Sequence, residues 1–355
     1  MSEPLPRSAY AAALASLPAM GPRRLLRLLR EHPPEEAWAR EAPAADPERA
    51  WQVCTDAGIP VVVLGRDGYP PRLADDPEPP GVLFTRGRLD CLHWPTAAIV
   101  GTRRCSRYGR DVAHELGADL AAAGVAVVSG LALGIDGAAH EGALQGGGAA
   151  PVGVVGSGLD VVYPRRHRSL WQRVADTGVL LGEAPPGAAP EPWRFPARNR
   201  IIAALADAVV VVESHAAGGS RHTVDAAEQR DRPILAVPGP VRSSSSAGTN
   251  ELLAQGAAPA RDAGDVLVAL SLVGAIVRDP SRRDLDRRPP PTGAAATLLD
   301  AIGWQPATMA DLVARTGLSP VAASLAAAHL RRDGWLTSRG DWLEQVAPGG
   351  RSGER

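Results

Sequence analysis

The sequence predicts an α/β fold with a doubly wound parallel sheet, preceded by a small helical domain and followed by a winged-helix-like domain. Two observations predict the sheet. Between residues 97 and 237, short β-branched runs alternate with helical patterns of roughly ten to eighteen residues. The runs, such as "AAIV", "VAVV" and "AVVVVE", are apolar throughout, which is typical of strands covered on both faces. In such sheets, ligands bind beyond the carboxyl ends of the strands.

The first 56 residues predict a helical domain of the helix-hairpin-helix or SAM-like kind. In "LPAMGPRRLLRLL", Pro22 suits a first helical turn, and the leucines from Leu25 to Leu29 form an apolar stripe. Another helix is expected in "PERAWQVCTDAG", and "IPVVVL" from Ile59 predicts a strand. The proline-rich "GYPPRLADDPEPPG" predicts no regular structure. The sheet domain is therefore expected to span residues 57–275.

A change of composition marks the end of the sheet domain. Residues 276–294 are charged and proline-rich, with almost no apolar residues, which predicts a linker. Residues 295–347 contain three helical patterns, each ended by glycine, and then "WLTSRGDWLEQV", which predicts a hairpin turning at Arg339 and Gly340. Three helices and a hairpin favour a winged-helix-like domain, and residues 348–355 would form a tail.

Charge and cysteine content exclude several classes of protein. The 38 basic and 39 acidic residues give a net charge of -1, so any polyanion site must be a local patch and not a general attraction. The three cysteines are far apart, which disfavours a disulfide framework and a zinc site. The N-terminus does not resemble a signal peptide, and no apolar run approaches 18 residues. We expect a cytoplasmic protein with no membrane partner and no cofactor.

The first candidate ligand loop, "GTRRCSRYGR", follows the strand "AAIV". Gly101 allows close backbone approach, and the start of the next helix offers donors from Thr102, Arg103 and Ser106. Helix N-termini attract anions and arginine adds a forked donor, so phosphate is the expected ligand. The Walker and dinucleotide signatures are both missing. The alternative is that these arginines are simply solvated on the helix surface.

The loop after the next strand contains Ser129 and Gly130, followed by Asp136 and His140 four residues apart on one helical face. This polar pair either borders a ligand cleft or is a buried structural pair that holds the turn. A serine hydrolase built on Ser129, Asp136 and His140 is disfavoured, because the GxSxG elbow is absent. The spacing also provides no metal site.

A third loop, "GSG", places Gly156, Ser157 and Gly158 after the strand in "PVGVV". The third glycine of the dinucleotide fingerprint and the acidic residue about 20 positions later are missing, which argues against NAD or FAD. The basic cluster from Arg165 to Arg168 is either part of an anion site or an ordinary solvated helix start.

The stretch "FPARNRIIAAL", residues 195–205, places cations where a helix is expected to begin. Pro196 favours a helix start, so Arg198, Asn199 and Arg200 would fall on its first turn. Cations there oppose the helix dipole, which favours a bound anion between them. The alternative is an ion pair with Glu183 or Glu213.

The last candidate loop, "AAGGSRHT", follows "AVVVVE". Gly218 and Gly219 precede Ser220 as a plausible N-cap, with Thr223 at the third helical position, and this pattern favours an anion nest. Because these loops all follow strands of one parallel sheet, they predict a phosphate-lined crevice at one edge of it.

The motifs "GTRRCSRYG", "VSGLALGIDGAAHEGAL", "GSGLDVVYP", "FPARNRIIAALADAVVVVE" and "GGSRHTVDAAEQRDRPILAVPGPV" resemble, in order and spacing, those of the DNA processing protein A family, also called Smf, over roughly residues 60 to 265. The resemblance implies an extended Rossmann-like domain that binds single-stranded DNA without catalysis. It also implies a role in natural transformation (competence), in which the protein protects incoming DNA, loads the RecA recombinase and forms a homodimer. The family's DNA-contacting loops map onto Arg103, Phe195, Arg198, Asn199 and Arg200, with the "SGLALGID" and "GGS" loops beside them.

Two departures and two alternatives stay open at this point. Gly218 stands where the family usually has serine, and "RRH" follows Tyr163-Pro164 where an acid and an asparagine are common. Rossmann-like nucleoside monophosphate phosphoribohydrolases are one alternative, although their PGGxGTxxE signature is absent. The other is a duplex DNA-binding regulator that acts through the winged-helix-like domain.

Overall fold

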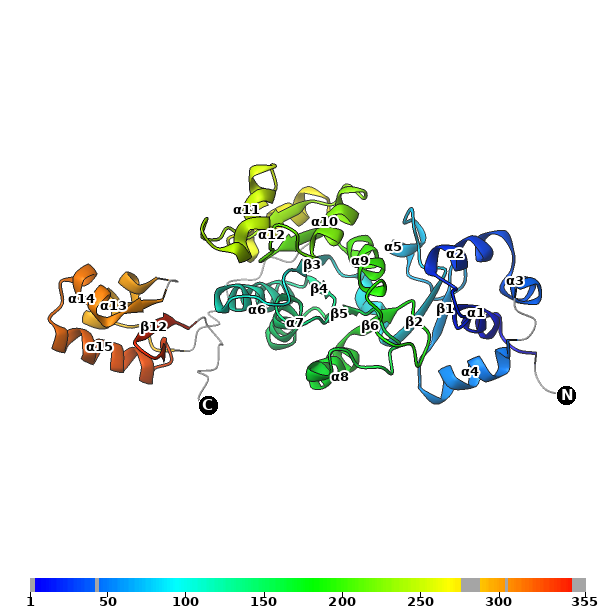
Figure 1. Ribbon diagram of the computed structural model, residues 1–355, viewed down its shortest axis with the longest axis horizontal. Coiled ribbons are helices and arrows are strands. Elements are labelled where there is room, and N and C mark those ends of the chain that lie inside the picture. Colours follow the sequence, from blue (N-terminus) through cyan, green and yellow to red (C-terminus); the bar gives the residue numbers. More distant parts are fainter. Residues whose placement is uncertain (1–3, 42–44, 276–287, 304–305, 347–355) are drawn as a thin grey trace. The chain divides into compact units, whose positions relative to one another are not determined.

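The computed structural model describes residues 4–41, 45–275, 288–303 and 306–346. Contacts divide the chain into two compact units, Met1–Asp279 and Pro280–Arg355. Figure 1 shows the elements of each unit. Residues 276–287 of the predicted linker and the predicted tail, 348–355, lie outside the described residues.

The first unit begins with four helices, which are α1 (Arg7–Ala15), α2 (Pro22–Glu31), α3 (Pro34–Glu41) and α4 (Pro47–Asp56). Pro22 occupies the first turn of α2, as predicted, and Leu25, Leu26 and Leu28 are buried while the arginines of the helix face solvent. Their apolar side chains join a cluster that includes residues of the neighbouring strands, such as Phe84. These helices therefore share a core with the edge of the sheet.

The sheet of the first unit has nine strands among the described residues, in the order β1-β2-β6-β5-β4-β3-β7-β8-β9. They are β1 (Val61–Val63), β2 (Val82–Gly87), β3 (Thr96–Val100), β4 (Ala126–Ser129), β5 (Val152–Val154), β6 (Val179–Gly182), β7 (Ala208–Val211), β8 (Ile234–Ala236) and β9 (Ala258–Pro259). The strands from β6 to β9 in this order are parallel, whereas β1 and β2 are antiparallel at one edge. The predicted doubly wound α/β fold is confirmed; the strand β2 was not predicted.

The strand order reverses beside β3. From β3 the chain proceeds through β4, β5 and β6 on one side, and then returns to place β7, β8 and β9 on the other. Such a reversal is a topological switch point, where the loops at the carboxyl ends of adjacent strands part and leave a crevice. The ends of β3 and β7 are therefore the expected place for a ligand.

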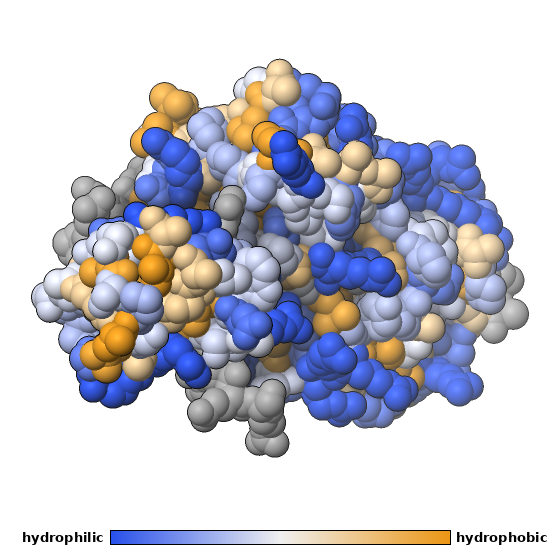
Figure 2. Space-filling view, turned by 60° about the vertical axis from the view of Figure 1, so that its left-hand side comes forward, coloured by the Kyte–Doolittle hydropathy of each residue, from blue (hydrophilic) through white to orange (hydrophobic). Residues whose placement is uncertain are grey.

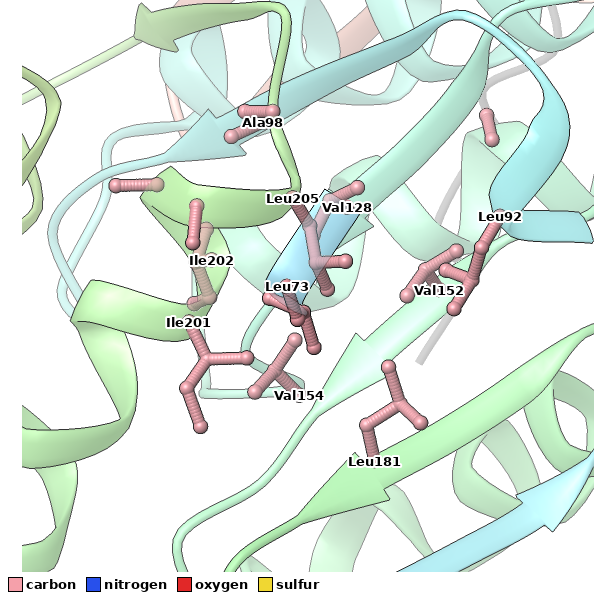
Figure 3. Close-up of a cluster of buried hydrophobic side chains, with 14 of the residues drawn as sticks. Leu73, Leu92, Ala98, Val128, Val152, Val154, Leu181, Ile201, Ile202 and Leu205 are labelled. Carbon is pink, nitrogen blue, oxygen red and sulfur yellow. The ribbon is translucent and has the colours of Figure 1, made fainter. Parts of the chain in front are cut away.

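Helices cover both faces of the sheet. They are α5 (Pro71–Ala74), α6 (Arg107–Ala122), α7 (Ile135–Gly146), α8 (Arg168–Thr177), α9 (Arg194–Leu205), α10 (Arg221–Glu228), α11 (Ala247–Ala254) and α12 (Ala263–Leu272), with 3₁₀ turns η1 (Leu89–His93), η2 (Arg165–His167) and η3 (Ser244–Ser246). Residues of α5, α9 and α10 share one core cluster, and residues of α6, α7 and α12 share another. Figure 3 shows Ile201, Ile202 and Leu205 of α9 gathered with Val154 of β5. This packing fixes α9 beside the switch point.

Two details differ from the sequence predictions. The stretch predicted to be irregular contains α5, because Pro71 fits the first helical turn and Leu73 is completely buried. Helix α9 begins at Arg194, two residues before Pro196, so Arg198 and Arg200 lie in its second turn. The conflict with the helix dipole that the sequence suggested is therefore weaker than expected, since the dipole acts mainly within the first turn.

The second unit contains α13 (Ala294–Ile302), α14 (Met309–Thr316) and α15 (Pro320–Arg332), with the strands β10 (Ala307–Thr308), β11 (Leu336–Arg339) and β12 (Trp342–Gln345). The strands form an antiparallel sheet in the order β10-β12-β11. Thr308 and Asp311 form a capping box on α14, and Gly317 ends it with φ 65°. The predicted hairpin is present; its winged-helix-like assignment stays a prediction.

On the face drawn in Figure 2, apolar residues lie in small groups between polar ones. None of the described helices combines the length and the apolarity needed to cross a membrane.

A buried ion pair joins the turn after α10 to the segment after α5. Arg230 Nε lies 2.6 Å from Asp76 Oδ2 and Nη2 lies 2.8 Å from Oδ1, with side chains only 5% and 4% exposed. The two residues are 154 positions apart, so this fork joins distant parts of the chain.

We predict that Arg230→Ala lowers the free energy of unfolding by about 3–5 kcal/mol, because it leaves the Asp76 carboxylate buried without its partner. Chemical denaturation measures this loss. The exposed Arg242→Ala is the matched control, expected to stay within about 0.5 kcal/mol of the unsubstituted protein. A similar small effect of both substitutions would contradict the role assigned to the ion pair.

His140 is a structural residue in the core of the first unit. It is fully buried, and its Nε2 lies 3.1 Å from the carbonyl oxygen of Val152 on β5. Asp136 instead accepts from the backbone N–H of Gly130, so the predicted Asp136–His140 pair is not formed. Burial lowers the pKa of His140 to about 4, against the opposing effect of the hydrogen bond to Val152.

This shift predicts that His140 lowers the free energy of unfolding as the pH decreases from neutral. Below the unfolded-state pKa of about 6.5, the His140 side chain binds a proton in the unfolded chain, whereas in the folded chain it binds one only at about pH 4. Proton binding therefore stabilises the unfolded state relative to the folded state in this pH range. The loss is on the order of 3 kcal/mol between pH 7 and pH 4. Denaturation of His140→Gln over the same pH range should show a correspondingly smaller loss; an unchanged pH dependence would overturn the assignment.

Candidate functional site

An open cleft of about 710 Å³ lies at the switch point. It is bounded by the loops that follow β3, β4 and β7 and by the first two turns of α9. The predicted site residues that line it are Gly101, Thr102, Arg103, Phe195, Arg198, Asn199, Gly219, Ser220 and Thr223. Three arginines and one aspartate lie on its wall, so its local charge is positive although the chain is nearly neutral.

One wall of the cleft combines a cation with two aromatic rings. The guanidinium carbon of Arg103 lies 4.9 Å from the centroid of the Phe195 ring, and the Tyr163 ring centroid lies 5.4 Å from that of Phe195. Arg103 is exposed and Tyr163 is 41% exposed. Aromatic rings and guanidinium planes of this kind stack on nucleobases, while the guanidinium also binds phosphate.

The floor of the cleft is formed by Arg198, whose side chain is only 7% exposed. Its Nε donates to Asn199 Oδ1 at 2.9 Å, its Nη1 donates to the carbonyl oxygen of Val154, and its Nη2 lies 3.9 Å from Asp136 Oδ2. A Cβ atom at Gly130 would fall 2.0 Å from Nη1, so glycine there leaves room for the guanidinium in its present position. Gly130 is thus needed beneath the cleft and does not line it.

The Arg198 guanidinium keeps its charge at neutral pH. Burial lowers the pKa of Arg198 to about 10, and the Asp136 carboxylate opposes that shift. Burial also raises the pKa of Asp136, against the effects of Arg198 and of the Gly130 and Ala132 N–H groups. The floor is therefore a nearly neutral pair, and the net positive charge belongs to the exposed arginines above it.

The helix start predicted to bind phosphate beside Ser106 already holds an internal carboxylate. The backbone N–H of Ser106 donates to Glu213 Oε2 at 2.8 Å, and its hydroxyl donates to Oε1 at 2.6 Å. Glu213 is buried, and a Cβ atom at Gly109 would lie 2.4 Å from its carboxylate. The prediction that Ser106 offers a free donor to the ligand is therefore not supported, because Glu213 occupies that helix N-terminus.

The loop before α10 forms another part of the cleft wall. Ser220 precedes the helix, as predicted, but its hydroxyl pairs with that of Ser214 at 2.8 Å and does not cap the helix. A Cβ atom at Gly218 would also lie 2.8 Å from Ser214 Oγ, which explains how glycine suits this position in place of the family's serine. Gly219 is exposed, whereas Thr223 is buried.

The remaining predicted residues lie outside the cleft lining. Ser129 donates to the carbonyl oxygen of Ile99 at 2.6 Å, and Ser157 donates to that of Val161 at 2.8 Å, so both hydroxyls serve the fold. Gly156 and Gly158 are buried beside Ser157. Arg200 Nη2 lies 2.6 Å from Glu183 Oε1, which is the ion pair that the sequence left open as an alternative.

The cleft also contains residues that the sequence did not single out. These are Arg104, Tyr163, His215 and His222. Tyr163 was quoted in a motif, but its approach to Phe195 joins a loop to the start of α9, 32 residues further along the chain, and has no local signal. Within the described ranges, no group of three or more His, Cys, Asp or Glu side chains is placed to hold a metal ion.

Comparisons with known proteins identify the family of this chain. The family model for DNA recombination-mediator protein A matches residues 60–271. A relative from Mycobacterium tuberculosis is 45% identical over 205 residues, which cover 57% of this chain and 52% of that protein. The DNA processing protein DprA of Streptococcus pneumoniae is 39% identical over 201 residues, which cover 57% of this chain and 71% of that one. The chain thus spans about half the length of the first of these relatives.

Two solved structures share the fold. The X-ray structure of DNA processing protein A from Streptococcus pneumoniae superposes with a TM-score of 0.63 and 32% identity, covering 74% of this chain and 98% of that one. A structure of DNA processing protein A from Helicobacter pylori, described for its single-stranded DNA binding mode, gives a TM-score of 0.54 at 30% identity over 60% of this chain and 96% of that one. With the family match covering more than half of its length, this chain belongs to the DNA recombination-mediator protein A family.

Proposed function

We propose that this protein binds single-stranded DNA in the switch-point cleft, without reading its sequence, and acts as a binding protein and not as an enzyme. The observation that carries the proposal is the exposed Arg103 stacked on Phe195 beside Tyr163, on the wall of a positively charged cleft. A cation and two rings can hold one phosphate and stack on a base of any identity. The Helicobacter pylori relative is described as binding single-stranded DNA, which is a ligand with both of these features, phosphates and bases.

The size of the cleft suits a few nucleotides. Its volume of about 710 Å³ lies within the range of sites that enclose one small ligand, so a long strand must continue beyond it. The neutral floor made by Arg198 and Asp136 supports the bases or sugars, and the exposed Arg103 and Arg104 meet the phosphates. This division places the charged contacts where solvent and salt also reach, so binding should weaken with ionic strength.

In cells, we propose that the protein protects incoming strands during natural transformation and loads the RecA recombinase onto them. The family description as a recombination mediator supports this role. We also propose a homodimer, since two linked clefts bind one strand more tightly than one. The apolar residues Val268, Leu272 and Val273 at the end of α12 are 60%, 83% and 48% exposed, which is the kind of surface that a second copy covers.

The second unit favours the single-strand proposal over duplex recognition by α15. In winged-helix and related folds, the residues at the start of the recognition helix contact the bases and phosphates of the major groove. The first two turns of α15 expose Val321 and Leu325, at 71% and 59%, and carry no arginine or lysine. An apolar helix start suits contact with protein better than contact with DNA.

A mobility-shift titration of the full-length protein tests the proposal. We expect a single-stranded oligonucleotide to bind more tightly than its duplex, with no preference between sequences and with an affinity that falls as salt rises. Tighter duplex binding would instead indicate a duplex regulator. Release of free base from nucleoside monophosphates would indicate the phosphoribohydrolase alternative.

We predict that Arg103→Ala lowers single-strand affinity about tenfold at low salt, and that the slope of log K against log[salt] becomes shallower by about 0.7, the value for one phosphate contact on a single strand. Fluorescence anisotropy at several salt concentrations measures both. Arg173→Ala, an exposed arginine on α8, is the matched control for the loss of one charge. Equal affinities for the two variants would remove Arg103 from the site.

Arg198→Ala provides the contrast with this variant. It removes a buried cation from Asp136 and Val154, so we expect it to lower the denaturation midpoint as well as the affinity. Arg103→Ala, on an exposed side chain, should leave the midpoint almost unchanged.

A further inference from the structure

A small hollow adjoins the cleft on the side of the N-terminal helices. Its volume is about 30 Å³, and it is lined by Met20 before α2, by Pro22 at the start of α2, and by Trp193 and Arg194 at the start of α9. Arg198 lines both the hollow and the cleft, so the two abut. The N-terminal helices therefore border the DNA-binding edge of the sheet that the proposed function requires.

The topology of the sheet explains this neighbourhood. The hollow lies over the ends of β5 and β6, where Val155 and the segment Glu183–Pro185 line it. The cleft lies over the ends of β4, β3 and β7, which come next in the strand order. The hollow and the cleft therefore lie side by side at the carboxyl edge of one parallel sheet.

Trp193 is an exposed aromatic residue at the junction. It is 46% exposed, and the guanidinium carbon of Arg194 lies 4.8 Å from its ring. It lies two residues before Phe195, so the start of α9 places one ring in the cleft and another in the hollow. The Nε of Arg194 is buried and has no hydrogen-bond partner among the residues that the structure describes. The junction thus repeats the combination of ring and guanidinium found in the cleft.

Helix α2 adds further guanidinium groups, because it carries a row of exposed arginines. Arg23, Arg24, Arg27 and Arg30 are exposed, and they fall within about 120° around the helix, opposite the buried leucines. From the first to the last, the row extends about 10 Å along the axis. Pro22, at the start of this helix, lines the hollow, and Arg23, the first arginine of the row, is the next residue along the chain.

Half of this row is available to a polyanion. Arg23 pairs with Glu78 at 2.8 Å and Arg24 with Glu41 at 2.6 Å, both at the surface, where such pairs contribute little. Within the described residues, Arg27 and Arg30 have no carboxylate within ion-pair distance. Four like charges on ten residues repel one another, and a bound polyanion would relieve that repulsion.

We propose that a single strand leaving the cleft passes over Trp193 and continues along the arginine face of α2. This inference rests on the proposed function and extends it, because it assigns the N-terminal helices a part of the DNA path. A strand of about six nucleotides would occupy the cleft alone, whereas one of about thirty would reach both surfaces. The two lengths therefore separate the cleft from its extension.

The test compares Arg27→Ala/Arg30→Ala with the unsubstituted full-length protein by fluorescence anisotropy, using oligothymidylates of about six and about thirty nucleotides. We expect the longer strand to bind about tenfold more weakly to the double variant at low salt, with a salt slope shallower by up to about 1.4, the value for two phosphates. Binding of the shorter strand should not change. Trp193→Ala should likewise weaken the longer strand more than the shorter one.

The matched control is Arg49→Ala/Arg173→Ala, which removes two exposed arginines from α4 and α8. If the unsubstituted protein binds both strands and the α2 variant matches this control on the longer one, the extension is wrong while the proposed function stands. If the unsubstituted protein binds neither strand, the proposed function fails and the extension fails with it.

Discussion

The buried guanidinium of Arg198 is the contact on which the candidate site depends. It joins α9 to the end of β5 through Val154 and faces Asp136 at the start of α7, so three elements that meet at the switch point are held by one side chain. The arrangement needs glycine at position 130, because a Cβ atom there would overlap the guanidinium. With Arg198 fixed, the start of α9 is fixed as well, and Phe195 and Trp193 are presented on its two sides. A buried charge thus sets the position of the exposed contact groups.

Internal carboxylates occupy the starts of α6 and α7, but not the start of α10. Glu213 takes the N-terminus of α6, and Asp136 accepts from the backbone of Gly130 beside α7. These N-termini are therefore neutralised by the protein itself. What remains in the cleft for an external anion is the exposed Arg103 and Arg104 and the uncapped start of α10, with the rings beside them to stack on bases. Such a surface is less suited to enclosing one phosphate than to supporting a strand that crosses it.

More of the fold than of the candidate site could be predicted from the sequence. Apolar strands alternating with helices indicated the doubly wound sheet, because a strand that is buried on both faces is apolar at nearly every position. The sequence also placed the candidate loops at the strand ends. It could not tell Arg198 from Arg200, since their roles depend on Asp136 and Glu183, which lie elsewhere in the chain, and on a helix that begins two residues earlier than Pro196 suggests. The hydrogen bond from Ser106 to Glu213, 107 residues away, also could not be predicted from the residues near Ser106 in the sequence.

The chemistry of the exposed groups explains why such a protein would bind strands without reading them. A guanidinium over a phenyl ring recognises charge and planarity, which every nucleotide has, and does not select a base edge. Each contact of this kind is weak at the ionic strength of a cell, because phosphate contacts are screened by salt. Useful affinity must then come from the number of contacts, either along one protomer or across two. A cleft of about 710 Å³ would hold too few nucleotides for that, so the surfaces beside it would decide how tightly a long strand is held.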